Sequence, residues 1–323
     1  MTEMDASIRE ELSADAQKLF DDIITQKVLG ASAHIKMISQ MIRDLCATAQ
    51  KKNESTDSLN LKIHQLADFF IEVRGEASQA ITNAINILIN GLDNEVKNGN
   101  EPFLKLVNQN IDDFEKNNTH NLELVNQYAQ SVLSNMKSIL LFDYSSTVGR
   151  MVEMCQHPLD VFVAESRAWD GGKPYIEQAL RGHHNVHYIT DAAIYHYLKD
   201  CDGVFIGSET NYADGTVFNT VGTEMVAALC NLLNIPFYVL TTLIKTDFRA
   251  VYGHIKKPLK LNLKKLFASG FSSEILDQID FSCPEIVEVP AKHITAFITE
   301  KGIVPPTAIF SLSESFLKYA GRD

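Results

Sequence analysis

The amino-acid sequence predicts an α/β protein, with a helical N-terminal domain at residues 1–137 followed by a doubly wound parallel-sheet domain at residues 138–323. Glycine and proline are unevenly distributed, because residues 1–140 contain only four of the 16 glycines and one of the nine prolines. These residue types interrupt helices and mark turns, so the first part should be helical and the second part rich in turns. The hydrophobic period also changes after Lys137, from helical spacing to short β-branched and aromatic runs.

Apolar residues recur at helical spacing through the first part. One such stripe begins after Ser13 and a second follows Gly30, which predicts two amphipathic helices that need partners. Further helices are expected at 59–73 and 77–95, with two more inside 103–138, joined by a polar stretch around 117–120. Residues 51–58 and 98–102 should form a turn and a loop.

Five short apolar runs in the second part predict strands, and helical patterns separate them. The runs are 138–146, 160–166, 185–190, 202–209 and 236–242. Alternating strands and helices favour right-handed βαβ units and a parallel sheet, whose ligands lie beyond the carboxyl ends of the strands. That rule nominates residues at strand ends: Asp143, Tyr144, Ser145, Glu165, Arg167, Glu209 and Thr242.

The charge balance argues against broad nucleic-acid binding. There are 29 Lys and Arg residues against 41 Asp and Glu residues, a net charge of −12, which repels a phosphate backbone. Residues 249–265 are the exception, with six basic residues and no acidic one. A solvated loop or edge strand is the simpler interpretation of this stretch, and a surface for an anion or a partner is the alternative.

The sequence lacks the signature motifs of several kinds of site. The five cysteines form an odd set without a CxxC pair, so neither a disulfide framework nor a zinc site is indicated, and a reducing compartment fits best. No GxGxxG or GxxxxGK[ST] motif is present, so we expect no nucleotide cofactor. No apolar run reaches the roughly 18–20 residues of a membrane span. We therefore expect a cytoplasmic protein that binds no metal and no membrane.

The densest group of polar and small residues spans 207–223. Glu209 at a strand end, an Asp-Gly turn, Asn219, and then Gly222 and Thr223 opening a helix are what an oxygen-rich ligand needs. The carboxylate can bind hydroxyls or move protons, and the N–H groups of a helix start can hold a phosphate. A helix cap with a structural asparagine is the competing interpretation.

The segment GSETNYADGTVFNTVGTEMVAALCNLLNIPFYVLTT (207–242) resembles the core signature of a known superfamily. That superfamily joins the alpha, beta and delta subunits of eukaryotic translation initiation factor 2B to two isomerases, which act on methylthioribose-1-phosphate and ribose-1,5-bisphosphate. Four further segments resemble its motifs in order: VLGASA (28–33), VRGEAS (73–78), AESRAWDGG (164–172) and VPAKHITAFITEKGIVPPTAI (289–309). The resemblance implies a helical N-terminal domain and a Rossmann-like C-terminal domain.

The residues that the isomerases use are changed. The resemblance implies a cysteine and an aspartate that move protons between adjacent sugar carbons, and here Asp143 and Glu209 stand at those positions. Thr220 replaces the lysine of the N-K-x-G-T motif, and Leu29 replaces the arginine of R-G-A. Two carboxylates in one crevice would raise the pKa of at least one of them.

The direction of the changes favours the alpha-subunit branch, because Tyr144-Ser145, Glu209 and Gly75-Glu76 resemble its Y-S, G-A-E and G-G-E segments. The resemblance then implies a non-catalytic protein with a regulatory or assembly role, which binds a sugar phosphate or nucleoside monophosphate in the interdomain crevice. It further implies a homodimer through the C-terminal domain and a larger assembly with related subunits. The expected ligand-binding residues are Gly30, Arg74, Tyr144, Ser145, Arg167, Glu209, Asn219, Gly222 and Thr223.

Two alternatives remain open. One is an aldose–ketose isomerase of a phosphorylated pentose that uses Asp143 and Glu209 as its acid/base pair. The other is an assembly scaffold without a ligand that uses the basic stretch around Lys256 and Lys257.

Overall fold

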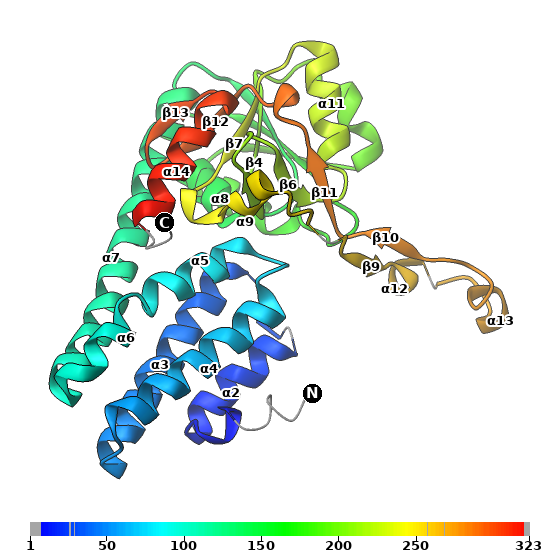
Figure 1. The fold of residues 1–323 in the computed structure, drawn as a ribbon. Coiled ribbons are helices and arrows are strands. Elements are labelled where there is room, and N and C mark those ends of the chain that lie inside the picture. Colours follow the sequence, from blue (N-terminus) through cyan, green and yellow to red (C-terminus); the bar gives the residue numbers. More distant parts are fainter. Residues whose placement is uncertain (1–7, 26, 29, 257, 268, 320–323) are drawn as a thin grey trace. The chain divides into compact units, whose positions relative to one another are not determined.

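The computed structural model describes residues 8–25, 27–28, 30–256, 258–267 and 269–319 (Figure 1). The chain forms two compact units, one of residues 1–120 with 315–323 and the other of residues 121–314. The first division lies inside the long helix α7 (Asn100–Leu133) and the second inside α14 (Ile309–Tyr319). A functional domain boundary between residues 137 and 138 stays a prediction.

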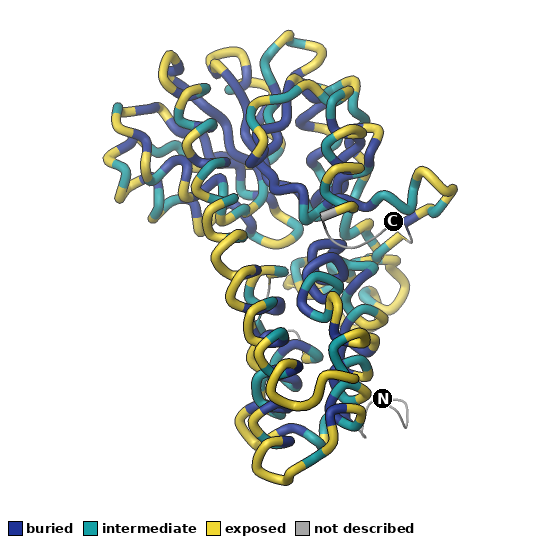
Figure 2. Tube along the Cα trace, turned by 60° about the vertical axis from the view of Figure 1, so that its left-hand side comes forward, coloured by how far each residue is buried: buried dark blue, intermediate teal, exposed yellow. Residues whose placement is uncertain are grey.

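The first unit is helical, as its scarcity of glycine and proline predicts. Ser13 and Ser55 cap the N-termini of α2 and α4 by accepting hydrogen bonds from backbone N–H groups three residues later. Apolar faces meet in a core, and Figure 2 shows buried residues facing inward and exposed residues facing outward along these helices. The elements are α2 (Ala14–Ile24), α3 (Ala31–Lys52), α4 (Thr56–Arg74), α5 (Gln79–Leu88), α6 (Leu92–Glu95), η1 (Val96–Asn98) and the start of α7.

Three expectations for this part were wrong in detail. Residues 103–138 do not form two helices: α7 is continuous, because no Gly or Pro interrupts it and the Thr119 hydroxyl donates to the Glu115 carbonyl at 2.9 Å. Pro102, expected in a loop, lies in the first turn of α7, where its missing N–H costs nothing. The expected helix 77–95 is divided into α5 and α6, since Gly91 adopts φ 78°.

The second unit is built on a seven-stranded sheet of order β13-β12-β7-β4-β1-β2-β3. All neighbours are parallel except β12 and β13, and β1 lies between β2 and β4. The five strands expected from the sequence all lie in this sheet. Its members are β1 (Ser138–Leu141), β2 (Asp160–Ala164), β3 (Asn185–Ile189), β4 (Gly203–Ile206), β7 (Phe237–Leu240), β12 (Ala296–Thr299) and β13 (Gly302–Val304).

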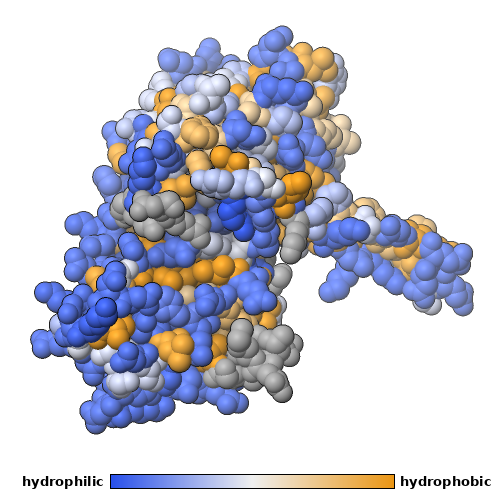
Figure 3. Space-filling model, in the orientation of Figure 1, coloured by the Kyte–Doolittle hydropathy of each residue, from blue (hydrophilic) through white to orange (hydrophobic). Residues whose placement is uncertain are grey.

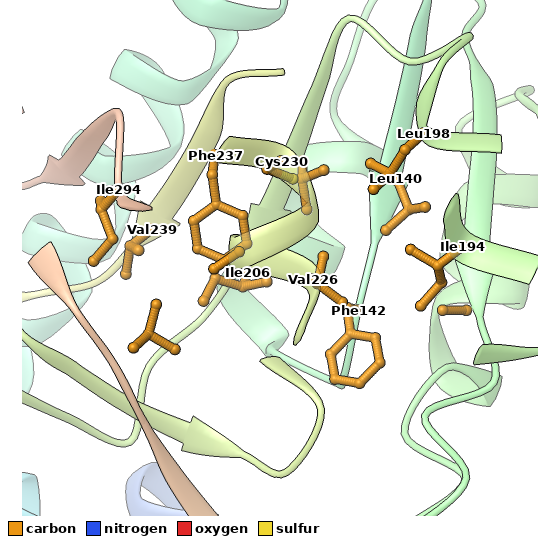
Figure 4. Close-up of a cluster of buried hydrophobic side chains, with 14 of the residues drawn as sticks. Leu140, Phe142, Ile194, Leu198, Ile206, Val226, Cys230, Phe237, Val239 and Ile294 are labelled. Carbon is orange, nitrogen blue, oxygen red and sulfur yellow. The ribbon is translucent and has the colours of Figure 1, made fainter. Parts of the chain in front are cut away.

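Helices connect the parallel strands, and side chains alternate between two apolar cores. Leu140 and Phe142 belong to one core, whereas Ile139 and Leu141 belong to the other. Figure 4 shows the first core, in which Phe142 lies beside Val226. The connecting helices are α8 (Ser146–Glu153), α9 (Lys173–Arg181), α10 (Ile194–Leu198) and α11 (Thr223–Leu233), with 3-10 turns η2 (Asp191–Ala193), η3 (Leu243–Lys245), η4 (Phe248–Tyr252), η5 (Ala291–His293) and η6 (Pro306–Ala308).

A second sheet of order β11-β6-β5-β8 was not expected. Asp214 and Gly215 turn the chain between β5 and β6, with the Asp214 carboxylate accepting from the Thr216 N–H at 2.8 Å and Gly215 at φ 86°. The sequence indicates this turn, but the flanking strands lie in a segment rich in polar and small residues, which does not have the apolar pattern of the predicted strands. The strands are β5 (Thr210–Tyr212), β6 (Val217–Thr220), β8 (Thr246–Asp247) and β11 (Ile286–Val289).

A hairpin-like arm leaves the second unit between β8 and β11 (Figure 1). It contains β9 (Lys260–Asn262) paired antiparallel with β10 (Ser282–Pro284), and the short helices α12 (Lys264–Phe267) and α13 (Ser273–Leu276). Apolar side chains lie exposed among polar ones along it, as Figure 3 shows for the face in view. Within the described parts of the chain, no helix combines the length and apolar character that a bilayer span requires.

Candidate active site

The turn after β1 holds Asp143 in a strained backbone conformation, with φ 55°. The buried Tyr175 hydroxyl from α9 fixes this turn, because it donates to the Asp143 carbonyl at 2.7 Å and accepts from the Ser145 N–H at 2.8 Å. The Ser145 side chain then caps α8 through the Val148 N–H. Tyr144, between them, has an exposed side chain.

Two hydroxyls hold the Asp143 carboxylate. The Thr220 hydroxyl at the end of β6 donates to Oδ2 at 2.8 Å, and the Ser166 hydroxyl after β2 donates to Oδ1 at 3.4 Å. A Cβ atom at Gly171 would lie 2.5 Å from Oδ1, so only glycine leaves room for the carboxylate. Segments that follow three strands therefore meet at this one side chain.

The environment raises the pKa of Asp143 to about 6. Burial is the largest cause; the hydrogen bond from Thr220 acts in the opposite direction, and the negative charge of Glu209 raises the pKa further. A carboxyl group with this pKa can give or take a proton near neutral pH.

Glu209 follows β4 and is half-buried. Its backbone N–H donates to the Phe218 carbonyl at 2.9 Å, which anchors it to β6. Its charge acts on Asp143, so the two carboxylates lie near each other, after the neighbouring strands β4 and β1. Their common role in one site stays a prediction.

A hydrogen bond from its backbone N–H holds Arg167 in position. The Asp191 carboxylate accepts from the N–H groups of Ser166 and Arg167, both at 2.9 Å. The guanidinium of Arg167 is about half exposed and lies 3.9 Å from the Glu165 carboxylate, so the two side chains form an ion pair. An exposed pair of this kind contributes little to stability.

Asn219 in β6 contacts the start of α11, where Gly222 is the N-cap and Thr223 the first residue. The Asn219 amide donates to the Thr223 hydroxyl at 3.1 Å, and that hydroxyl donates to the Thr220 carbonyl at 2.7 Å. Gly222 adopts φ 98° at the N-cap position. These contacts fit the competing interpretation of a helix cap with a structural asparagine, and a direct contact of these residues with ligand stays a prediction.

Gly30 and Arg74 belong to the first unit. Gly30 is the N-cap of α3 at φ 95°, and Arg74 is the last residue of α4. Burial lowers the pKa of His34 in the first turn of α3, and the charge of Arg74 lowers it further, so both predicted residues lie in one region of this unit. Leu29, at the position of the family's arginine, lies outside the described residues.

Sequence reasoning missed four residues that shape the site: Tyr175, Ser166, Asp191 and Lys245. The Lys245 ammonium donates to the carbonyl of Ser208, next to Glu209. Ser166 lies inside the AESRAWDGG segment and could have been nominated from it. Among the described residues, no three His, Cys, Asp or Glu side chains are grouped as a metal ion would require.

Comparison with known proteins places the chain in a family. The model of the Initiation factor 2 subunit family matches residues 30–306. The ribose 1,5-bisphosphate isomerase of Methanocaldococcus jannaschii is 20% identical over 303 residues, which cover 93% of this chain and 94% of the relative. The methylthioribose-1-phosphate isomerase of Nostoc punctiforme is 32% identical over 127 residues, 38% of this chain and 36% of the relative.

A solved structure shows the same fold. The translation initiation factor eIF-2B of Pyrococcus horikoshii OT3 superimposes with a TM-score of 0.73 at 17% identity, over 91% of this chain and 98% of that one. The resemblance stated from the five motifs is confirmed, and the chain belongs to the Initiation factor 2 subunit family.

Proposed function

We propose that this protein is an aldose–ketose isomerase of a phosphorylated pentose and that Asp143 and Glu209 are its acid/base pair. The raised pKa of Asp143, produced by burial and by the charge of Glu209, is the observation that carries the proposal. Two interacting carboxyl groups at one site can share a proton, which leaves one as an acid and the other as a base. Relatives named as isomerases of two phosphorylated pentoses support the same substrate class.

Such a reaction needs one acid and one base. Opening the ring of a 1-phosphorylated pentose places a proton on the ring oxygen, and isomerisation removes the hydrogens of C2 and its hydroxyl while C1 gains one. Asp143, whose pKa is raised, is suited to donate the proton to the ring oxygen. The carboxylate of Glu209 is suited to remove the proton from C2 and return it to C1, while Asp143 regains a proton from the C2 hydroxyl.

Turnover of ribose 1,5-bisphosphate and of methylthioribose 1-phosphate tests the proposal. Asp143→Asn and Glu209→Gln should each reduce kcat at least about 100-fold, the lower range for general acid–base catalysis. Glu177→Gln, which changes an exposed carboxylate on α9, should retain full turnover. Absence of turnover of both substrates by the wild-type protein would refute the isomerase.

A second candidate is the non-catalytic, alpha-subunit-like protein that the motif changes favour. One observation supports it: both oxygens of Asp143 already accept hydrogen bonds within the protein, from Thr220 and Ser166, so the carboxylate has a structural role without substrate. In this case sugar phosphates or nucleoside monophosphates should stabilise the protein, and Arg167→Ala and Asn219→Ala should abolish that stabilisation. Calorimetry and thermal unfolding with such a panel provide the measurement.

For both candidate functions we expect a homodimer formed through the C-terminal domain. Analytical ultracentrifugation of the full chain should give twice the mass of 36.1 kDa. A monomer at micromolar concentration would contradict this part of the proposal. A cytoplasmic location, and assembly with related subunits, also stay predictions.

A further inference from the structure

Lys256 does not behave as part of the solvated basic loop that residues 249–265 were expected to form. It is only 8% exposed, although its neighbour Ile255 is 84% exposed. Its backbone N–H donates to the Tyr212 hydroxyl at 3.0 Å, which ties the root of the arm to β5. Lysine is almost never buried to this degree unless its ammonium has a partner.

The ammonium of Lys256 lies on one defined face of the second sheet. Nζ donates to the Thr210 hydroxyl at 3.2 Å and lies 5.9 Å from the centroid of the Phe218 ring. Thr210 and Phe218 are directly paired across β5 and β6, so their side chains share this face.

The same face carries the contact to Asp143. Side chains alternate along a strand, so Thr220 lies on the face of Phe218, about 6.6 Å further along β6. The Thr220 hydroxyl donates to the Asp143 carboxylate at 2.8 Å. Thr210, which the Lys256 ammonium contacts, and Thr220, which contacts the Asp143 carboxylate, therefore lie on one face of the sheet, on adjacent strands.

A cation on this face would offset the negative charge of the site. Asp143 and Glu209 would repel a phosphorylated ligand, and a nearby ammonium offsets that repulsion. Thr220 occupies the position of the lysine in the N-K-x-G-T motif that this chain resembles, so that positive charge is missing from β6. Lys256 brings a positive charge to the same face from a different segment.

We propose that Lys256 is a phosphate-binding residue of the site. From the root of the arm, its ammonium supplies the positive charge that a lysine at the position of Thr220 would supply. This inference rests on the proposed function insofar as the ligand is phosphorylated. It does not require turnover, because a non-catalytic protein that binds a sugar phosphate needs the same charge.

The experiment measures the affinity for ribose 1,5-bisphosphate by calorimetry. Lys256→Met should weaken binding at least about tenfold, the loss expected for one charge-assisted contact. Lys260→Met, which removes an exposed lysine of the same arm, should bind like the wild type. The wild-type affinity should fall more steeply with salt than that of Lys256→Met.

A charge rescue separates binding from a structural role. In the Lys256→Met background, Thr220→Lys should return the affinity to within a few-fold of the wild type, because it restores an ammonium on β6. A purely structural lysine would not be rescued in this way. If methionine at this position prevents folding, Lys256→Gln retains a donor for Thr210 without the charge and gives the same comparison.

The outcomes distinguish this inference from the proposed function. Binding without turnover in the wild type, lost in Lys256→Met, would refute the isomerase and support the phosphate site. Wild-type affinity in a folded, uncharged Lys256 variant would overturn the phosphate site and leave the isomerase intact. A wild-type protein that binds no ribose 1,5-bisphosphate, no methylthioribose 1-phosphate and no nucleoside monophosphate would overturn both.

Discussion

The Tyr175 hydroxyl bridges the two ends of the turn that carries Asp143, donating to the Asp143 carbonyl and accepting from the Ser145 N–H. Tyr175 is fully buried, and Asp143 has a positive φ of 55°. A backbone conformation of this kind persists only where its surroundings hold it. The position of the Asp143 side chain therefore depends on the phenol of Tyr175, which belongs to α9.

Tyr175→Phe should destabilise the protein by about 1–3 kcal/mol, because the buried carbonyl and N–H lose their partner. Urea unfolding measures this free energy. Tyr188→Phe is the matched control, since Tyr188 has an exposed side chain, and its effect should stay within about 0.5 kcal/mol. Equal effects of the two substitutions would show that the turn is held without the Tyr175 hydroxyl.

This bridge illustrates what the sequence can and cannot predict. Asp143 and Glu209 were nominated because parallel strands end at a common edge, a rule that needs only the order of strands and helices. Tyr175 was not, because its contact with Asp143 spans 32 residues and depends on how α9 packs against the turn. No local pattern around Tyr175 marks this contact.

The errors in the predicted fold have the same origin, because local sequence patterns do not reveal contacts between distant segments. Apolar runs predicted the parallel strands, whereas the segment that contains β5 and β6 is rich in Gly, Asn, Asp and Thr and therefore resembles a loop. Lys256 was grouped with exposed lysines because charge patterns do not reveal that the Tyr212 hydroxyl holds its backbone against β5. Burial of one member of a charged run is set by tertiary contacts.

Thr220→Val should raise the pKa of Asp143 above its wild-type value of about 6, because the Thr220 hydrogen bond favours the charged carboxylate. Glu209→Gln should have the opposite effect, since it removes a like charge. A ¹³C NMR titration of the aspartate carboxyl groups measures both shifts without requiring activity. Shifts of the same sign in the two variants would contradict the assigned contacts.

Asp143→Asn should change how stability depends on pH. In the wild type the folded carboxyl keeps its proton up to about pH 6, whereas the unfolded one releases it near the ordinary value of 3.8. The folded state thus binds more protons in this window, and wild-type stability falls as pH rises through it.

The variant lacks this term, so its stability relative to the wild type should increase from about pH 4 to about pH 6 and then stay level. Urea unfolding of both proteins across this range supplies the comparison. Two parallel curves would mean that the Asp143 carboxyl titrates alike in the folded and unfolded chains.

Gly222→Ala should destabilise the start of α11 through backbone strain and through displacement of the Phe142 ring. The same substitution at Gly253 measures the backbone strain alone. Gly222 has φ 98°, and a Cβ there would lie 2.6 Å from Cζ of Phe142, a fully buried ring. Gly253 also has a positive φ of 85° but nothing within 4 Å of its Cβ position. Gly253→Ala should therefore cost only the backbone strain, about 1–3 kcal/mol, and Gly222→Ala about 1–3 kcal/mol more for the displaced ring. Equal losses in thermal or urea unfolding would show that Phe142 yields without cost and that Gly222 is required for its φ alone.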